Sequence, residues 1–507
     1  MANPTVSRIP PPFSLSRDHH GPPRKVSLTS SNPQAPSWFK NPWPSYRTTS
    51  AWDVYQAYQR GAAIAPQCLK PEGTEQVLVD EVLSPEDDWI DKNGGRLLDE
   101  DTVPGSSKMY IRPEFSNIKD GDDEDDWREP PVRVIDPTWG NEFDKEERVT
   151  WLGHAGVLVQ LPWGKDVKGE QRGGMCGLLF DPIFSYRCSP TQYAGPARYL
   201  DPPCTVSMLP AVHAYFISHD HYDHLDYYTV MDLWRYHQTT IHFFVPLGLK
   251  QWFTSSGIPS QRVTELDWWH EALLSFSSFS GLEYSPQYSP NGIDESRDKK
   301  LEVNSDSALT LKVVFTPAQH RSGRGVFDHM TTLWGSWCVG AVGQADRKIA
   351  LDRGMKEWAG FKIFFGGDTG YRYATAPEDD ENYICPAFQQ IADYYSPFNL
   401  SLLPLSTGSS LPFLRTVLSL SLDQYILTSA FHCSPADSLN IHLILKSQRS
   451  LGIHWGTFCD TDEARGSRVD FGRCRRAFGV GKDWDAPSTG NGVFVVSDIG
   501  ETLTISS

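Results

Sequence analysis

Residues 219–226 read His-Asp-His-Tyr-Asp-His-Leu-Asp and follow directly on an apolar run, Val212 to Ile217. A strand that ends in this stretch brings several imidazoles and a carboxylate into one small volume. Nitrogen and carboxylate oxygen are ligands that Zn²⁺ prefers, and a catalytic zinc keeps one position open for water. Two ligand sets within six residues predict two metal ions close together. The alternative, a polar surface loop with spare histidines, becomes weaker once the other apolar segments are read.

A dinuclear centre needs more donors, and each of three other apolar segments is followed by a His or an Asp. Each segment is short, rich in β-branched or aromatic residues, and bounded by Gly, Pro or Ser, which is typical of a strand. Sites form where strands finish and loops begin, so these donors are expected to meet at one sheet edge. Leu311–Phe315 leads to His320, Phe361–Phe365 leads to Asp368, and Leu451–Ile453 leads to His454.

The candidate ligands divide between two ions. Gly366 and Gly367 precede Asp368, and without a Cβ they let the backbone approach a metal pair, so that this carboxylate can bridge both ions. His320 or His454 taken alone could equally be a buried core histidine. Taken together, the sequence assigns His219, His221 and His320 to one ion, Asp223, His224 and His454 to the other, and Asp368 to both.

Further stretches outside the metal motif carry a family resemblance. They are Asn41–Pro44, Thr150–Ala155, Asp181–Phe184, Ser189–Pro190, Phe216–Asp226, Val245–Gly248, Leu266–Trp269, Leu333–Trp337, Gly367–Tyr371 and Ile453–Phe458. With them the chain resembles the metallo-β-lactamase fold superfamily, and within it the phospholipases D that hydrolyse N-acyl-phosphatidylethanolamine. The metal motif alone indicates the superfamily, and the Trp-rich stretches narrow it to this branch. The resemblance covers residues 38–50 and 148–480.

The resemblance implies an α/β fold, a four-layer αββα sandwich with two Zn²⁺ at one edge of the paired sheets. The seven ligands chosen above coincide with the metal positions of the family. A Tyr inside the family's metal motif and a His in a later loop contact the phospholipid, and they match Tyr222 and His432. Before that His the animal enzymes have a short Gly-Ala-Tyr-Glu-Pro-Arg-Trp stretch, whereas this chain has Leu405–Arg415 and a longer bridge within 405–431.

The expected activity is that of a zinc-dependent phosphodiesterase. Two zinc ions supply an ionised water and stabilise charge on the attacking and leaving oxygens. The resemblance implies hydrolysis of N-acyl-phosphatidylethanolamine to N-acylethanolamine and phosphatidic acid, with Asp223, Asp368 and His432 as catalytic residues and Tyr222 and His432 in contact with substrate. His432 could protonate the leaving alkoxide, hydrogen-bond the phosphate or be only structural, and Tyr222 could simply pack.

The sequence is also compatible with other functions, other metals and other roles for two residues. The chain could be another hydrolase of this fold, acting on a lactone or a different phosphodiester, or a non-catalytic lipid-binding protein, although such a protein would be expected to lose ligands. No His-x-Lys pair occurs, which excludes the phospholipases D that form a phosphohistidine. Iron or manganese would accept the same ligands as zinc. Asp226 and His154 are candidates for orienting a metal-bound imidazole, with a core histidine as the alternative for His154.

Three regions are expected along the chain. Residues 1–37 are Pro- and Ser-rich and predict a disordered tail, and residues 38–147 form an N-terminal extension with a helix at Ala51–Ala62. The catalytic domain covers residues 148–507. Polar insertions are expected at Gly164–Gly174 and Pro286–Asp306, and an acidic loop at Asp120–Asp126.

Composition limits the partners. The chain has 46 Lys and Arg against 63 Asp and Glu, a net charge of −17, which argues against general affinity for nucleic acid or for an anionic membrane. The chain has nine cysteines and no CxxC pair, which predicts reduced thiols in an intracellular protein. The sequence shows no signal peptide and no apolar run long enough to span a bilayer. The expectation is an intracellular protein, cytoplasmic or peripherally bound to a membrane that holds its phospholipid substrate, with a homodimer possible.

The membrane contact is expected at Leu411–Leu418, which is apolar with one Arg, and an ordinary buried helix is the alternative. The aromatic residues Trp38, Phe39 and Trp43 are the next candidates for this contact.

Overall fold

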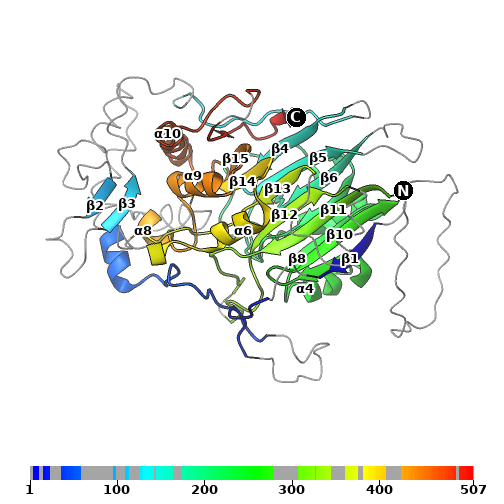
Figure 1. Cartoon of the computed structure of the whole chain (residues 1–507), viewed down its shortest axis with the longest axis horizontal. Helices are drawn as coiled ribbons and strands as arrows, with labels where there is room; N and C mark the ends of the chain where they lie inside the picture. Colours follow the sequence, from blue (N-terminus) through cyan, green and yellow to red (C-terminus); the bar gives the residue numbers. More distant parts are fainter. Residues whose placement is uncertain are drawn as a thin grey trace.

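Two β-sheets stacked between helices form the fold, as the computed structural model shows (Figure 1). The structure describes residues 4–10, 15–22, 36–58, 95–98, 109–113, 126, 128–141, 144–163, 174–277, 307–325, 327–343, 360–374, 381–406, 424–486 and 490–505. The seven-stranded sheet has the order β17 (Thr502–Ile505), β4 (Glu147–Gly153), β5 (Gly156–Pro162), β6 (Met175–Phe180), β7 (Val212–Phe216), β8 (His242–Pro246) and β9 (Val263–Leu266).

The second sheet has eight strands, and its last four are parallel to one another. Its order is β1 (Thr5–Ile9), β10 (Glu271–Ser277), β11 (Ser307–Thr316), β12 (Ser336–Ala341), β13 (Lys362–Phe365), β14 (Leu400–Pro404), β15 (Arg449–Ile453) and β16 (Val493–Val495). A separate two-stranded sheet contains β2 (Gly95–Leu98) and β3 (Met109–Pro113).

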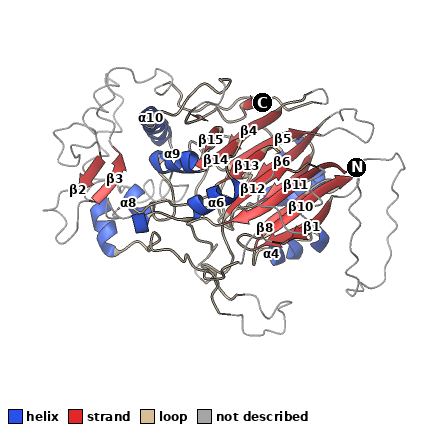
Figure 2. Ribbon diagram, in the orientation of Figure 1, coloured by secondary structure: helices blue, strands red, loops and turns tan. Residues whose placement is uncertain are grey.

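The helices cover the outer faces of the two large sheets (Figure 2). Side chains of α3 (Tyr227–His237) and α4 (Lys250–Ser255) pack on the outer face of the seven-stranded sheet, and those of α6 (Ala387–Tyr395) and α9 (Pro435–Ile444) join the core of the other sheet. The prediction of a four-layer αββα sandwich is confirmed. Further helices among the described residues are α8 (Gln424–Thr428), α10 (Thr461–Ala477), η2 (Val206–Met208), η3 (Ser260–Arg262) and η4 (Glu381–Tyr383).

Strand β7 is buried on both faces and is apolar apart from His213. Phe216 faces the core between the sheets, where its ring centroid lies 5.5 Å from that of Trp337 on β12. Its neighbour Tyr215 faces the other way and packs with Phe243 and the helices outside the sheet. A strand that is buried on both faces has no polar side in its pattern.

The N-terminal stretch departs from the expectation of a disordered tail. Residues 5–9 form β1, which pairs antiparallel with β10 at the edge of the eight-stranded sheet, so the expectation is wrong for these residues. The order comes from tertiary pairing, because a polar five-residue strand shows little pattern of its own. Residues 51–58 are helical, and the rest of the predicted helix lies outside the described residues. Most of the three expected insertions and the whole of Leu411–Leu418 also lie outside the described residues.

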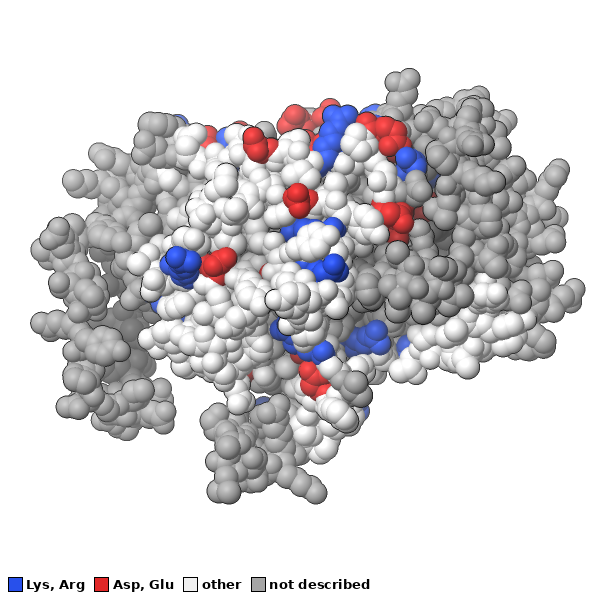
Figure 3. Space-filling model, turned by 180° about the vertical axis from the view of Figure 1, so that it is seen from behind, with Lys and Arg blue, Asp and Glu red and all other residues white. Residues whose placement is uncertain are grey.

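Three properties of the described residues concern the kinds of partner that the protein could bind. Among the described residues no helix is both long and apolar enough to cross a bilayer. On the face seen in Figure 3, acidic and basic side chains are interspersed rather than gathered by sign. Of the three aromatic candidates for a membrane contact, Trp38 is 41% exposed but Phe39 is 1% exposed and packs in the core. Phe39 therefore cannot contact a membrane in this structure.

Candidate metal centre

The ends of several strands bring the candidate ligands to one place. Strand β7 ends just before His219, β13 before Asp368 and β15 before His454. Strand β11 runs antiparallel to β12, and β12 antiparallel to β13, so β11 delivers His320 at the same edge as β13. The structure brings all seven candidate ligands into two adjoining groups of donor atoms.

The first group consists of three imidazoles whose ring nitrogens converge. His219 Nε2 lies 2.8 Å from His221 Nδ1, and His320 Nε2 lies 3.1 and 3.2 Å from these two atoms. Nitrogens bound 2.0–2.1 Å from one tetrahedral Zn²⁺ lie about 3.3 Å apart. His219 and His320 are fully or almost fully buried. The three nitrogens therefore fit a single ion.

The second group contains Asp223, His224 and His454. His224 Nε2 lies 3.2 Å from His454 Nε2, and Asp223 Oδ2 lies 4.0 Å from the latter atom. His154 also belongs here, because its Nε2 lies 3.1 Å from Asp223 Oδ2. This contact fits the expectation that His154 orients a ligand, although the ligand is a carboxylate rather than an imidazole.

Asp368 lies between the two groups. Its Oδ2 is 3.2 Å from His224 Nε2 and 3.7 Å from His320 Nε2, while its Oδ1 is 2.8 Å from His454 Nε2. Oδ1 is buried and makes no hydrogen bond with a described residue, so it is left with an acceptor that a cation would satisfy. This placement fits a carboxylate shared by two ions.

A glycine makes that placement possible. Gly367 has a φ of +57°, and a Cβ at this position would lie 2.5 Å from Cβ of Ser218. Any other residue would push the Asp368 loop away from the end of β7. The close approach of these two loops therefore depends on Gly367.

The electrostatics of the centre suit metal ligands. Burial lowers the pKa of His219 and of His320 well below the usual value, which keeps both imidazoles neutral, the form that binds a metal. Burial alone would raise the pKa of Asp368, but the neighbouring His224, His454 and His432 lower it well below its usual range. Asp368 is therefore a carboxylate at neutral pH.

Backbone carbonyls fix which nitrogen of two ligands faces the centre. His320 Nδ1 donates to the carbonyl of Phe431 at 2.7 Å, and His454 Nδ1 donates to the carbonyl of Ser406 at 3.2 Å. A carbonyl only accepts, so the Nδ1 of each ring carries the proton and Nε2 has a free lone pair. Both rings are thereby held in the tautomer that can bind a metal through Nε2.

Asp181 is a functional residue that the sequence analysis did not assign. Its Oδ2 accepts from His224 Nδ1 at 2.7 Å, and its Oδ1 accepts from the backbone N–H of Ser218 at 2.8 Å. Ser218 Oγ in turn accepts from His219 Nδ1 at 2.8 Å, so Asp181 supports one ligand in each group. The sequence did contain a sign of this role. Asp181 directly follows the apolar strand β6, just as the candidate ligands follow apolar strands.

Asp226 does not orient a metal ligand, so that expectation is wrong. It is the N-cap of α3, where its side chain accepts from the backbone N–H groups of Tyr228 and Thr229. An aspartate directly before a helix satisfies amides that have no partner within the helix. The capping role accounts for its position two residues after the metal motif.

The two expected substrate contacts lie beside the centre. His432 Nδ1 is buried, 3.7 Å from Asp368 Oδ2, and has no hydrogen-bond partner among the described residues. Burial lowers the pKa of His432 to about 3. Tyr222 is half-buried and packs on Phe458, with the guanidinium carbon of Arg324 4.0 Å from its ring centroid. His432 therefore lies beside the candidate ligand Asp368, and Tyr222 lies in the chain between the candidate ligands His221 and Asp223.

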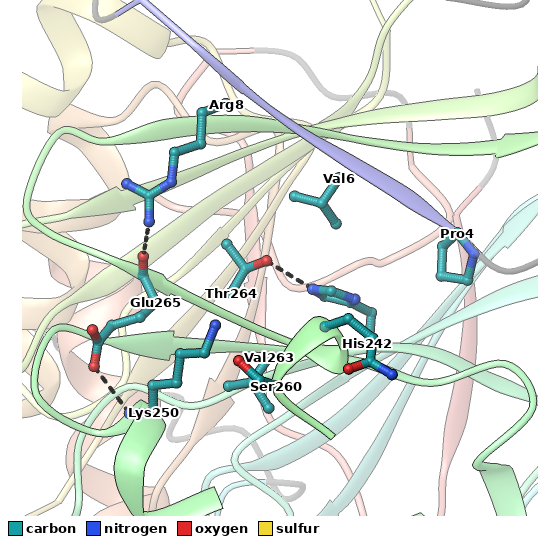
Figure 4. Close-up of a pocket in the computed structure, with 10 residues that line it drawn as sticks. Pro4, Val6, Arg8, His242, Lys250, Ser260, Val263, Thr264 and Glu265 are labelled. Atoms are coloured by element: carbon teal, nitrogen blue, oxygen red, sulfur yellow. Dashed lines mark hydrogen bonds between the residues drawn. The ribbon is translucent and has the colours of Figure 1, made fainter. Parts of the chain in front are cut away.

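A separate cavity of about 430 Å³ lies between β1 and β9 (Figure 4). Arg8, His242 and Lys250 line it, and Arg8 donates to the carbonyl of Glu265 at 2.6 Å. None of the candidate metal ligands lines this cavity. It is therefore distinct from the metal centre.

Comparisons with known proteins agree with the geometry. A profile of the beta-lactamase superfamily domain matches residues 177–455. N-acyl-phosphatidylethanolamine-hydrolyzing phospholipase D 1 of Caenorhabditis elegans is 30% identical over 313 residues, which cover 61% of this chain and 64% of the relative. The mitochondrial N-acyl-phosphatidylethanolamine-hydrolyzing phospholipase D of Saccharomyces cerevisiae is 25% identical over 55% of this chain and 44% of the relative.

The match to these relatives is partial, since it spans less than two thirds of the length of either. Among solved structures, the metallo hydrolase Igni18 from Ignicoccus hospitalis aligns with 71% of this chain and 99% of its own, at 16% identity and a TM-score of 0.35.

Proposed function

The chain belongs to the beta-lactamase superfamily, and from its metal centre we propose that it is a zinc-dependent hydrolase of N-acyl-phosphatidylethanolamine. The reaction would be of the phospholipase D type and would release N-acylethanolamine and phosphatidic acid. The observation that carries the proposal is Asp368 between two sets of nitrogen and oxygen donors. The substrate comes from the similarity to the Caenorhabditis elegans enzyme, whose name states it.

Bound zinc ions would supply an acidified water and a Lewis acid for the phosphate oxygens. Asp368 would hold the two ligand groups at a fixed separation, and Asp181 would keep His224 and His219 in the orientation that binds. Water would add to phosphorus, the P–O bond to the ethanolamine oxygen would break, and that oxygen would gain a proton. His432 would donate a hydrogen bond to substrate, a role supported by its Nδ1, which has no hydrogen-bond partner among the described residues.

Two arginines support an anionic substrate over a neutral lactone. Arg321 directly follows the ligand His320, and its guanidinium carbon lies 4.2 Å from the ring centroid of Phe431, the residue before His432. Arg324 lies over Tyr222, and its buried Nη1 has no hydrogen-bond partner among the described residues. A buried guanidinium nitrogen without a hydrogen-bond acceptor favours an anion such as a phosphate diester.

Replacing Arg324 by Gln is therefore expected to lower kcat/KM for N-acyl-phosphatidylethanolamine by roughly 10- to 100-fold, the value of a hydrogen bond to a charged group. The matched control is Arg235→Gln, which removes an arginine stacked on Tyr236 of α3, away from the centre. Initial rates on mixed micelles measure both variants. Equal rates for Arg324→Gln and the wild type would show that this arginine does not bind substrate.

The function itself is tested with purified protein and a defined substrate in ¹⁸O-labelled water. Attack on phosphorus places one labelled oxygen in phosphatidic acid and none in N-acylethanolamine, and mass spectrometry reads both products. Removal of metal with a chelator should abolish the reaction, and added Zn²⁺ should restore it. If a lactone or an aryl phosphodiester is hydrolysed while this phospholipid is not, the rival hydrolase function holds.

Peripheral membrane association belongs to the same proposal, because the substrate is a bilayer lipid. The expected contact at Leu411–Leu418 lies outside the described residues and stays a prediction. Of the three aromatic candidates in the N-terminal extension, Trp38 is 41% exposed, whereas Trp43 is partly buried and stacks on Trp268. Trp38 is therefore the best candidate of the three for such a contact.

A further inference from the structure

A further cluster, of two histidines and one aspartate, lies outside the metal centre. Asp267 follows strand β9, and its two carboxylate oxygens face two histidines from the N-terminal stretch. Oδ1 lies 2.8 Å from His19 Nε2, and Oδ2 lies 2.8 Å from His20 Nε2. One ligand atom from each of these three residues lies within 4.8 Å of the other two. None of the three belongs to the groups around Asp368.

The placement of the His19 and His20 rings can be compared with that of two histidines in the first ligand group. The rings of His19 and His20 have centroids 4.4 Å apart and planes at 69°, against 4.4 Å and 79° for His219 and His221. A neutral imidazole pair with one carboxylate is a donor set that divalent transition metals accept. The two imidazole pairs therefore have a similar relative placement.

One contact in the cluster is unsatisfied without a cation. His20 Nε2 is buried and lies 2.8 Å from Asp267 Oδ2, but the two atoms do not have the angles of a good hydrogen bond. His19 is 3% exposed and Asp267 is 7% exposed, so water has little access to the charge of this carboxylate. A buried carboxylate between two imidazoles is stabilised by a positive ion. The close approach of His20 Nε2 without good hydrogen-bond angles and the buried charge of Asp267 both point to such an ion.

We propose that His19, His20 and Asp267 form a third metal site, which binds a divalent transition ion such as Zn²⁺ in a structural role. The side chain of His20 is 15% exposed, so solvent can complete the coordination from that side. The site is independent of the proposed hydrolase function, because it shares no ligand with the dinuclear centre.

The contacts around this site explain what the ion would stabilise. The N–H of Lys40 donates to the carbonyl of His19 at 2.9 Å, and the N–H of Gly21 donates to the carbonyl of Trp38 at 2.8 Å. The adjoining Asn41 donates through Nδ2 to the carbonyl of the ligand His320 at 2.7 Å. An ion at Asp267 would thus fix the N-terminal segment against a loop of the dinuclear centre.

Metal content per chain tests the proposal, in full-length protein prepared with a tag that contains no histidine. The wild type is expected to bind one more ion than His20→Ala, by inductively coupled plasma mass spectrometry. The matched control is His270→Gln: His270 Nδ1 accepts from the backbone N–H of Asp267, so the ring lies beside the site without being a ligand. This variant should bind as many ions as the wild type.

A second variant separates this site from the dinuclear centre. In protein that carries Asp368→Asn, the His20→Ala change should still remove one ion, whether or not the dinuclear centre is loaded. Anomalous scattering at the zinc edge should place a peak among His19, His20 and Asp267. Equal metal content with and without His20, and no such peak, would overturn the proposal and leave a hydrogen-bonded contact between the N-terminal segment and Asp267.

Discussion

Replacing Asp368 by Asn is expected to leave the protein folded and to reduce turnover to less than about a tenth, on the scale of losses at metal sites. Asparagine has the same shape as aspartate but carries no charge. The change therefore removes the negative charge that lies 3.2 Å from His224 Nε2 and 2.8 Å from His454 Nε2. Without that charge the two ligand groups hold cations less tightly, and a water between them loses acidity.

The measurement is the steady-state rate on N-acyl-phosphatidylethanolamine, with circular dichroism to check the fold. Asp393→Asn is the matched control: it makes the same chemical change on the surface helix α6, where Asp393 accepts from Gln389 Nε2 at 2.8 Å. This control should keep nearly full activity. An Asp368→Asn protein with its metals bound and a wild-type rate would show that Asp368 does not bridge the centre.

The replacement of Trp337 by Ala should destabilise the fold by about 3–5 kcal/mol, the usual cost of removing a buried tryptophan side chain. Trp337 has no exposed surface, and its ring centroid lies 4.5 Å from that of Phe315 and 5.5 Å from that of Phe216. Its Nε1 also donates to the carbonyl of Ile217 at 2.8 Å, two residues before the ligand His219. The loss of this bond leaves a buried carbonyl without a partner.

Urea unfolding followed by fluorescence measures the change as a lower midpoint, with the other tryptophans as reporters. Phe327→Ala is the control, because Phe327 is 99% exposed and its loss should change stability by no more than about 0.5 kcal/mol. If the two variants unfold at the same urea concentration, Trp337 does not hold the two sheets together.

Local sequence was sufficient where one short segment specifies both structure and chemistry. The apolar run of β7 followed by His219 and its neighbours predicted a strand with metal ligands at its end, and the same pattern located His320, Asp368 and His454. These predictions depend on periodicity and donor type, which a few adjacent residues carry. The order of the strands did not follow from the segments, because register is set by pairing partners far away in the chain.

Asp226 and Asp181 show where this reasoning fails. Asp226 lies two residues after the candidate ligand His224, and Asp181 directly follows an apolar strand. Asp226 caps α3, however, whereas Asp181 accepts a hydrogen bond from His224. The type of residue is the same, and only the direction of the side chain separates the two roles. That direction depends on what lies across the loop, which the local pattern does not contain.

The sequence by itself determined the kind of centre, since the types and spacing of His and Asp at strand ends limit the chemistry to metal binding. The tertiary structure decided which donor atoms lie together, which residues support them, and that His19 and His20 lie against Asp267. Residues 19 and 267 are far apart along the chain, and no periodicity connects them. Only the packing of the N-terminal segment against the end of β9 brings their donor atoms together, because contact over such a distance is set by the folded sheets.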